Sequence, residues 1–187
     1  MERITVSDER VIARQIGRAP RGLSAVARRC RYGCPAVIRV HPIVDGAPFP
    51  TLYWLSCPHL GLRVDRLESA GWVGRLEERL AADAALAARL AAAREEYVRT
   101  RLVLLSADEV GELRARGILE SLAGRGIGGI AEAGRLKCLH LHVAHALATA
   151  NPIGAIVLDL VDAVECPPEE VICSALEGAE QIDQIDR

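Results

Sequence analysis

The first third of the chain has the residue pattern of a small sheet. Residues 22–30, 35–43 and 51–57 are rich in β-branched and aromatic side chains, as strands are. The segments between them, RYGC and VDGAPFP, are typical of turns. Before them, SDERVIARQIG predicts a short helix that Ser7 or Asp8 caps and Gly17 ends. This order predicts a helix followed by a three-stranded antiparallel meander.

From Pro58 onward the apolar spacing becomes that of helices. The pattern predicts helices over 59–71, 72–105 and 107–124, with boundaries at Gly71 and Asp83, and then a glycine-rich loop over 125–134. Another helix is expected over 137–151, because Pro152 disfavours helix at the residue before it. We therefore expect an α+β fold, in which a small three-stranded antiparallel sheet near the N-terminus packs against a mostly helical remainder.

The length and apolar content fit one domain. The chain has 187 residues, of which 50% are hydrophobic, which is enough to bury a core. The Pro167-Pro168 pair precedes an acidic segment. We expect a single domain over residues 1–166 and an acidic tail over 167–187 that contains at most one short helix.

Charge and hydropathy predict the cellular location of the protein and exclude some classes of partner. A net charge of −2 predicts no attraction to nucleic acid or to an anionic membrane surface. The start lacks the apolar stretch of a signal peptide, and the apolar run 153–164 is too short to insert into a membrane and contains Asp159 and Asp162. We expect a cytoplasmic protein, in which six cysteines favour metal binding or thiol chemistry over disulfides.

The nonapeptide KCLHLHVAH, residues 137–145, concentrates the chemistry of the chain. It holds the only lysine, one of the six cysteines and three of the five histidines. At helical spacing, Cys138, His142 and His145 share one face, with His140 nearer the apolar stripe. That stripe is the expected core face (Leu136, Leu139, Val143, Leu147 and Ala150).

Three further cysteines fall at one edge of the predicted sheet. Cys30 ends the first strand, Cys34 precedes the second and Cys57 ends the third. Outer strands of such a sheet are about 10 Å apart, so these thiols can converge with Cys138 on one ion. The candidate metal ligands are thiols and imidazoles (Cys30, Cys57, Cys138, His140, His142 and His145), a set that suits zinc, with an iron–sulfur cluster as the second alternative.

Thiol catalysis is the third alternative. Lys137, the histidines and a helix start can lower the pKa of Cys138 and make it nucleophilic. The candidate catalytic residues are then Cys138, His145 and Lys137. Arg18 and Arg21 are candidate contacts for a small anionic substrate, together with Lys137. The sequence leaves the reaction open.

At these motifs the chain resembles a known family. The segments RQIGRAPRG, RRCRYGCPAV, DGAPFPTLYWLSCPHL, RLESAG, GIGG, KCLHLHVAHALA and NPIG occur in the order seen in an uncharacterised bacterial family, domain of unknown function 501, familiar from actinobacteria. The resemblance runs from about Arg14 to Gly154. Cys34 departs from the family pattern, and the acidic tail lies outside it. The residues that match the family motif are Cys30, Cys57, Lys137, Cys138, His140 and His145.

The resemblance implies no reaction, so two classes of function stay open. One is a metal- or thiol-dependent enzyme that acts on a small anionic substrate. The other is a non-catalytic module, linked by its resemblance to cell division or envelope processes. In that module a purely structural Cys/His cluster fixes the fold, and the alanine-rich helix binds a protein partner.

Overall fold

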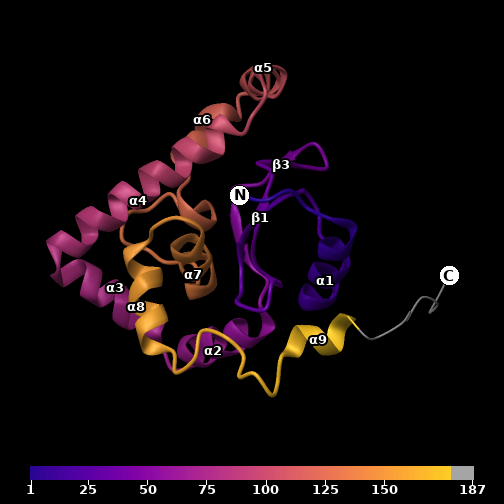
Figure 1. The fold of residues 1–187 in the computed structure, drawn as a ribbon. Coiled ribbons are helices and arrows are strands. Elements are labelled where there is room, and N and C mark those ends of the chain that lie inside the picture. The colour runs from indigo at the N-terminus through magenta and orange to yellow at the C-terminus, as the bar shows by residue number, and fades with distance from the viewer. Residues whose placement is uncertain (178–187) are drawn as a thin grey trace.

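The centre of the fold is a three-stranded antiparallel sheet in the order β1-β2-β5, in a computed structural model that describes residues 1–177 (Figure 1). The strands are β1 (Leu23–Arg29), β2 (Pro35–Val40) and β5 (Tyr53–Leu55). Val26 pairs with Ile38, and Ile38 pairs with Trp54. The predicted meander and the α+β class are both confirmed. The turn before β5 contains a further hairpin, β3 (Ile43–Val44) and β4 (Ala47–Pro48), that the pattern did not predict.

Both faces of the sheet are covered. Alternate residues of a strand point to opposite faces, so Ile38 and Trp54 pack with Ile12 of helix α1 (Val6–Ile16). Val37 and Leu55 pack instead in the main core with helix α7 (Leu139–Ala148). Figure 1 shows α1 and α7 on opposite sides of the sheet. Helix α7 is therefore an internal helix.

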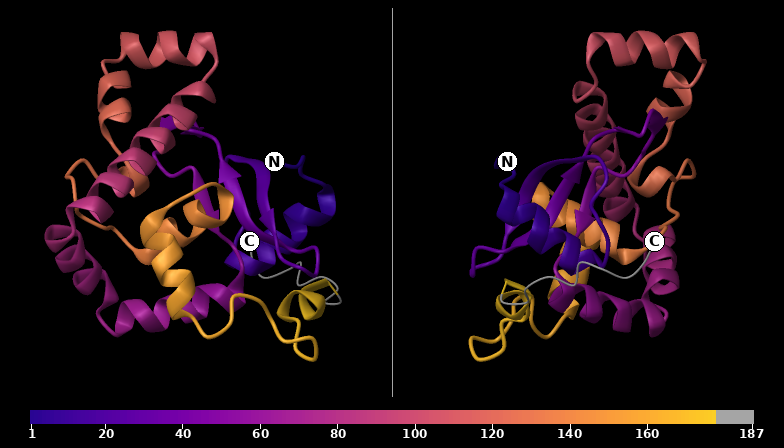
Figure 2. Two further views of the ribbon diagram at one scale, coloured as in Figure 1. Left: turned by 60° about the vertical axis from the view of Figure 1, so that its left-hand side comes forward. Right: turned by 90° about the vertical axis from the view of Figure 1, so that its right-hand side faces the viewer.

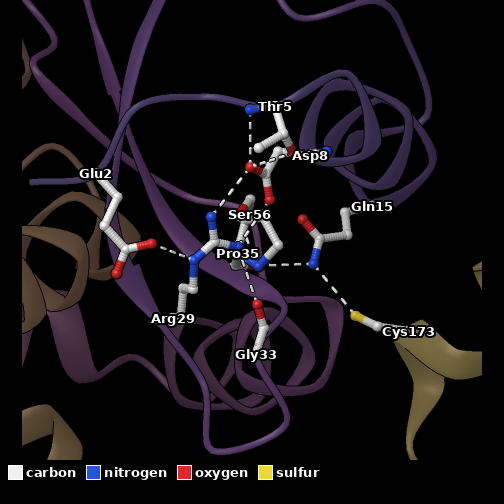
Figure 3. A network of polar contacts seen from close by, with 9 residues as sticks. All are labelled: Glu2, Thr5, Asp8, Gln15, Arg29, Gly33, Pro35, Ser56 and Cys173. Atoms are coloured by element: carbon white, nitrogen blue, oxygen red, sulfur yellow. Dashed lines mark hydrogen bonds and ion pairs between the residues drawn. The ribbon is translucent and has the colours of Figure 1, made fainter.

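Helix α1 is held to the sheet by the polar network in Figure 3. The helix begins at a capping box in which Thr5 is the N-cap and Asp8 accepts from the backbone of Thr5, so the predicted part of Asp8 in the cap is confirmed and that of Ser7 was wrong. Gly17 ends the helix as expected, with φ of 69°. Arg29 of β1 donates to both carboxylate oxygens of Asp8, at 2.7 and 3.0 Å. This guanidinium lowers the pKa of Asp8 to about 2.

Three helices run from the sheet around the outside of the molecule. They are α2 (Pro58–Ser69), α3 (Trp72–Ala82) and α4 (Ala84–Val103). The predicted boundary at Asp83 is confirmed, because this residue ends α3 and its side chain caps α4. Figures 1 and 2 show α3 and α4 meeting at an angle that encloses α7 and α8 (Pro152–Leu160).

The single helix predicted over 107–124 is in fact two. Helix α5 (Ala107–Ala115) and helix α6 (Leu119–Gly124) are separated at Gly117, whose φ of 67° is a conformation that a helix does not tolerate. The glycine-rich loop follows and includes a short 3₁₀ turn, η1 (Ile127–Gly129).

A buried arginine anchors that loop. Arg101 of α4 is fully buried, and its guanidinium donates to four backbone carbonyls, among them Pro50 at 2.9 Å and Leu122 at 2.5 Å. No carboxylate pairs with it within residues 1–177. These backbone carbonyls therefore take the place of a counter-ion.

The helix predicted to reach Asn151 ends earlier. Helix α7 stops at Ala148, and Asn151 caps the next helix, α8, by accepting a hydrogen bond from the backbone of Gly154. Proline at the first position of a helix is favourable, so Pro152 begins α8, whereas α7 has already ended with Thr149 as its C-cap. Within residues 1–177, no single helix is long and apolar enough to cross a membrane. Helices α7 and α8 reach that length and hydropathy only when they are taken together, and the two are bent by 103° relative to each other.

The segment after α8 returns to the N-terminal end of the fold. Helix α9 (Ile172–Glu177) lies beside α1, and Gln15 donates to Sγ of the buried Cys173 over 3.2 Å (Figure 3). The start of the acidic tail therefore has contacts with the domain. Its remainder, residues 178–187, lies outside the described residues, and the division at residue 166 stays a prediction.

Candidate functional site

The histidines of α7 do not lie where the helical pattern predicted. His142 and His145 are 3% and 0% exposed, whereas His140 is half-buried. Cys138 has extended backbone and precedes the helix, so the helical spacing from Cys138 to His142 does not apply. The predicted pattern requires one core face and one solvent face on this helix. Because α7 lies between the sheet and the outer helices, both of its faces are buried.

Cys138 and His140 meet an acid from a distant part of the chain. Glu68, in the last turn of α2, reaches the start of α7, where its Oε1 accepts a hydrogen bond from the backbone of Leu139 over 2.5 Å. The same oxygen lies 3.1 Å from Nδ1 of His140. Cys138 makes no side-chain cap, so Glu68 serves as the negative group that a helix N-terminus favours.

The second nitrogen of His140 faces α2. Its Nε2 lies 3.3 Å from the carbonyl oxygen of Gly61 and 3.4 Å from Oδ1 of the exposed Asp65. A hydrogen bond with Cys138 and the charges of Glu68 and Asp65 raise the pKa of His140 to about 9, against the effect of burial. The ring therefore carries both protons and a positive charge at neutral pH, unless a metal ion replaces one of these protons.

Glu68, Cys138 and His140 form a candidate metal site, which we call the α2–α7 site. Their ligand atoms all lie within 4.8 Å of one another. Two ligands bound to one zinc ion are at most about 4.6 Å apart, given bonds of about 2.0–2.3 Å. The group thus brings together sulfur, nitrogen and oxygen donors at nearly the spacing that a metal ion requires.

The other two histidines of the nonapeptide belong to a separate buried chain of polar groups. Because Gly154 donates to Asn151, the accepting atom of that amide is its oxygen, and this fixes the orientation of the amide. The same oxygen lies 3.3 Å from Nδ1 of His142. The amide nitrogen lies 3.2 Å from Nδ1 of His145. Burial lowers the pKa of His142 to about 4 and also lowers that of His145.

His145 is fully buried between two tyrosine rings of the core. It stacks on Tyr53 and meets Tyr97 edge-on, with ring centroids 5.7 and 4.9 Å away. Its Nε2 lies 3.5 Å from Oε2 of Glu96, which is longer than an ordinary hydrogen bond. His145 thus lies among aromatic rings, whereas Cys138 belongs to the α2–α7 site. The catalytic role of Cys138, His145 and Lys137 stays a prediction.

The cysteines of the sheet edge do not join the α2–α7 site. Within residues 1–177, neither Cys30 nor Cys57 belongs to a group of three or more clustered ligand atoms. Cys30 closes the turn between β1 and β2 through backbone bonds with Gly33 and Cys34. Burial raises the pKa of Cys57, with smaller effects from Cys173 and Cys166, which keeps its thiol protonated.

The predicted anion contacts are also dispersed. The guanidinium of Arg18 stacks over Trp54, 5.1 Å from the ring centroid, and Arg21 pairs with Asp45. Lys137 lines a different pocket of about 430 Å³ together with Arg125 and the glycine-rich loop. Arg18, Arg21 and Lys137 therefore each have different contacts and do not form one anion site.

Sequence reasoning missed Glu68 and Asp65. One signal was present, because an acid in the last turn of a helix is disfavoured by the helix dipole and Glu68 occupies such a position. An acid at this position therefore indicates an interaction with a group outside its own helix. Its partner could not be named without the packing of α2 against α7.

The matching family places the motifs in a wider group of proteins. The model of the family described as "Protein of unknown function (DUF501)" matches residues 26–159, which is more than half of the chain and runs from within β1 to near the end of α8. No match was found among curated proteins or among solved structures. The matched region contains all three residues of the α2–α7 site. The chain therefore belongs to the DUF501 family, a family of unknown function.

Proposed function

We propose that this protein is a cytoplasmic metal-binding protein that holds a zinc ion at the α2–α7 site through Glu68, Cys138 and His140. The observation that carries the proposal is the convergence of three different ligand atoms within 4.8 Å from two helices. Thiolate and imidazole favour zinc among the abundant divalent ions. An iron–sulfur cluster is less well supported, because it takes several thiolates and this group contains one.

The number of ligands separates an enzyme from a structural module. Three protein ligands leave a fourth position for water or substrate, as in catalytic zinc sites, whereas four close the site. Asp65 faces the other nitrogen of the ring, because its Oδ1 lies 3.4 Å from Nε2 of His140 whereas Glu68 lies against Nδ1, so Asp65 is an outer partner of the histidine and not a fourth ligand. Within the described residues the proposed ion therefore has three protein ligands, which favours an open site that activates water.

Cobalt substitution tests the proposal directly. Co²⁺ bound by a thiolate absorbs light through sulfur-to-metal charge transfer, so titration of the metal-free protein reports the Cys138 ligand. We expect the band in the wild type and in Cys30→Ser, which changes a half-buried cysteine outside the site. Cys138→Ser should lack the band. A band that survives in Cys138→Ser, or that is absent from the wild type, contradicts the proposal.

Asp65→Asn tests the outer contact of His140. We expect zinc affinity to fall by about tenfold or more, as for other lost outer partners of a ligating histidine. An affinity equal to that of the wild type would contradict this role. Arg66→Met is the matched control, since it changes the exposed neighbouring residue on α2.

Binding of a small anion is a second candidate function, and a different observation favours it. The pocket beside the glycine-rich loop is lined by Lys137 and Arg125 and, within the described part of the chain, by no acidic side chain. Lys137 directly precedes Cys138, so the two sites adjoin in sequence. Titration with inorganic phosphate tests this function: Lys137→Met should weaken binding by about tenfold, and Arg66→Met should not.

A further inference from the structure

A large, mostly apolar cavity shares no lining residue with the α2–α7 site. It has a volume of about 1020 Å³ and lies between α3, α4 and the segment 123–135. Leu80 of α3, Leu90 and Val98 of α4, and Ile127 and Ile130 of the loop are among its lining residues. This volume is at the upper end of the range for small-molecule sites, which are mostly apolar with a few placed polar groups.

One buried polar side chain lines this cavity from α7. His142 is 3% exposed and is the only residue of α7 among those lining the cavity in the described part of the chain. Its Nδ1 lies against the oxygen of Asn151, so this nitrogen carries a proton and donates it. No hydrogen-bond partner within residues 1–177 approaches Nε2, and no carboxylate pairs with the ring.

The protonation state of His142 follows from these contacts. A second proton on Nε2 would leave a buried charge without a counter-ion, which is costly. The ring is therefore neutral, and Nε2 presents an acceptor lone pair. Because Nε2 has no partner within the described residues, a donor from a ligand can bind it in place of solvent, with the net gain of one hydrogen bond.

The charged groups of the cavity do not point to an ionic ligand. Arg135 pairs with Glu77 at 2.9 Å. Arg94 donates to the carbonyl oxygens of Gly124 and Ala131, at 3.1 and 2.7 Å. The remaining charged side chains that line the cavity are exposed and of both signs (Arg99, Glu95 and Glu132). Recognition therefore rests on apolar contact and on the acceptor.

We propose that the α3–α4 cavity binds a neutral, largely apolar small molecule that carries a hydroxyl or N–H group. The ligand packs its apolar body against the leucine and isoleucine side chains and donates one hydrogen bond to Nε2 of His142. This site is distinct from the metal site and does not depend on metal binding.

A matched pair of probes tests the acceptor. 1-Naphthol and 1-methoxynaphthalene share a ring system, but only the naphthol donates a hydrogen bond. Equilibrium dialysis against the full chain should show naphthol bound about tenfold more tightly, the effect of one hydrogen bond. In ¹⁵N-histidine spectra, naphthol should shift the Nε2 resonance of His142, and the ether should not. Equal affinities, or an Nε2 resonance unmoved by saturating naphthol, overturn the proposal.

Two tryptophan substitutions on α4 test the place of binding. Ala91 is an exposed residue that lines the cavity, so Ala91→Trp should fill it and abolish binding of both probes. Ala88 is exposed on the same helix and does not line the cavity, so Ala88→Trp should bind both probes as the wild type does. Naphthol binding that persists unchanged in Ala91→Trp contradicts the proposal.

Discussion

Oε1 of Glu68 lies 3.1 Å from Nδ1 of His140, although 72 positions separate the two residues in the chain. The carboxylate also caps α7 through the backbone of Leu139. The candidate metal site and the joint between α2 and α7 are therefore built from the same atoms. A cation at this point, whether a proton on His140 or a metal ion, neutralises the Glu68 carboxylate and stabilises that joint.

Zinc binding should weaken as the pH falls below about 9. The pKa of His140 is raised to about 9, so at lower pH the imidazole must release a proton before it binds a metal ion. Calorimetry in buffers of different ionisation enthalpy should detect this release at neutral pH. A zinc affinity that does not change between about pH 6 and pH 8 would contradict ligation by His140.

The metal-free protein should show the opposite trend in stability. The pKa of His140 is raised above its ordinary value of 6.5, so its pairing with Glu68 contributes fully below pH 6.5 and is lost as the pH rises through about 9. Urea unfolding of metal-free protein across this range checks the sign. The slope should disappear in His140→Gln.

The Asp8–Arg29 pair should make the fold sensitive to acid. The pKa of Asp8 is lowered from 3.8 to about 2, so its contribution is present above pH 3.8 and is lost as the pH falls through 2. A shift of this size corresponds to roughly 2 kcal/mol. We expect Asp8→Asn to reduce the free energy of unfolding at pH 7 by about that amount. Glu9→Gln, at the exposed neighbouring position, should change it by less than about 0.5 kcal/mol.

The sheet and the outer helices could be predicted because their signals are local. The β-branched segments predicted three strands, which correspond to β1, β2 and β5 in the correct order. Asp83 marked the end of α3 because a side-chain cap depends only on neighbouring residues. The break at Gly117 was missed because an isolated glycine inside a helical pattern is compatible with a continuous helix.

The candidate site could be predicted only in part because burial depends on tertiary packing. The nonapeptide drew attention to Cys138 and His140, which do lie in the α2–α7 site. The roles of its histidines were exchanged: His142 was placed on the polar face and is buried, whereas His140 was placed near the core and is half-buried. Glu68 enters through a contact 72 positions away that periodicity does not encode.

Arg101 should be far more important to stability than its neighbour Arg99. Arg101→Met leaves the carbonyls of Pro50, Gly126, Leu122 and Arg125 without their buried donor. We expect the free energy of unfolding to fall by about 3 kcal/mol or more. Arg99→Met, on the exposed side of the same helix, should change it by less than about 0.5 kcal/mol. Equal effects of the two substitutions in urea unfolding would contradict the anchoring role.

Gly154 should be intolerant of a side chain. A Cβ atom there would overlap the carbonyl oxygen of His142 and lie 2.6 Å from Cβ of Ala146, so α7 and α8 would have to separate. We expect Gly154→Ala to destabilise the protein by about 2 kcal/mol or more. Gly74→Ala, in the open interior of α3, should instead stabilise it by about 0.5–1 kcal/mol. Thermal unfolding of the two variants gives shifts of opposite sign if this packing is correct.

The metal content of protein purified without air tests the central claim most directly. Elemental analysis should find one zinc ion per chain in the wild type and in Cys30→Ser. It should find little or none in Cys138→Ser, since that variant lacks the thiolate of the α2–α7 site while the rest of its fold is unchanged. Wild-type protein that is folded but neither contains zinc nor takes it up on reconstitution, or Cys138→Ser protein with undiminished zinc, would contradict the account.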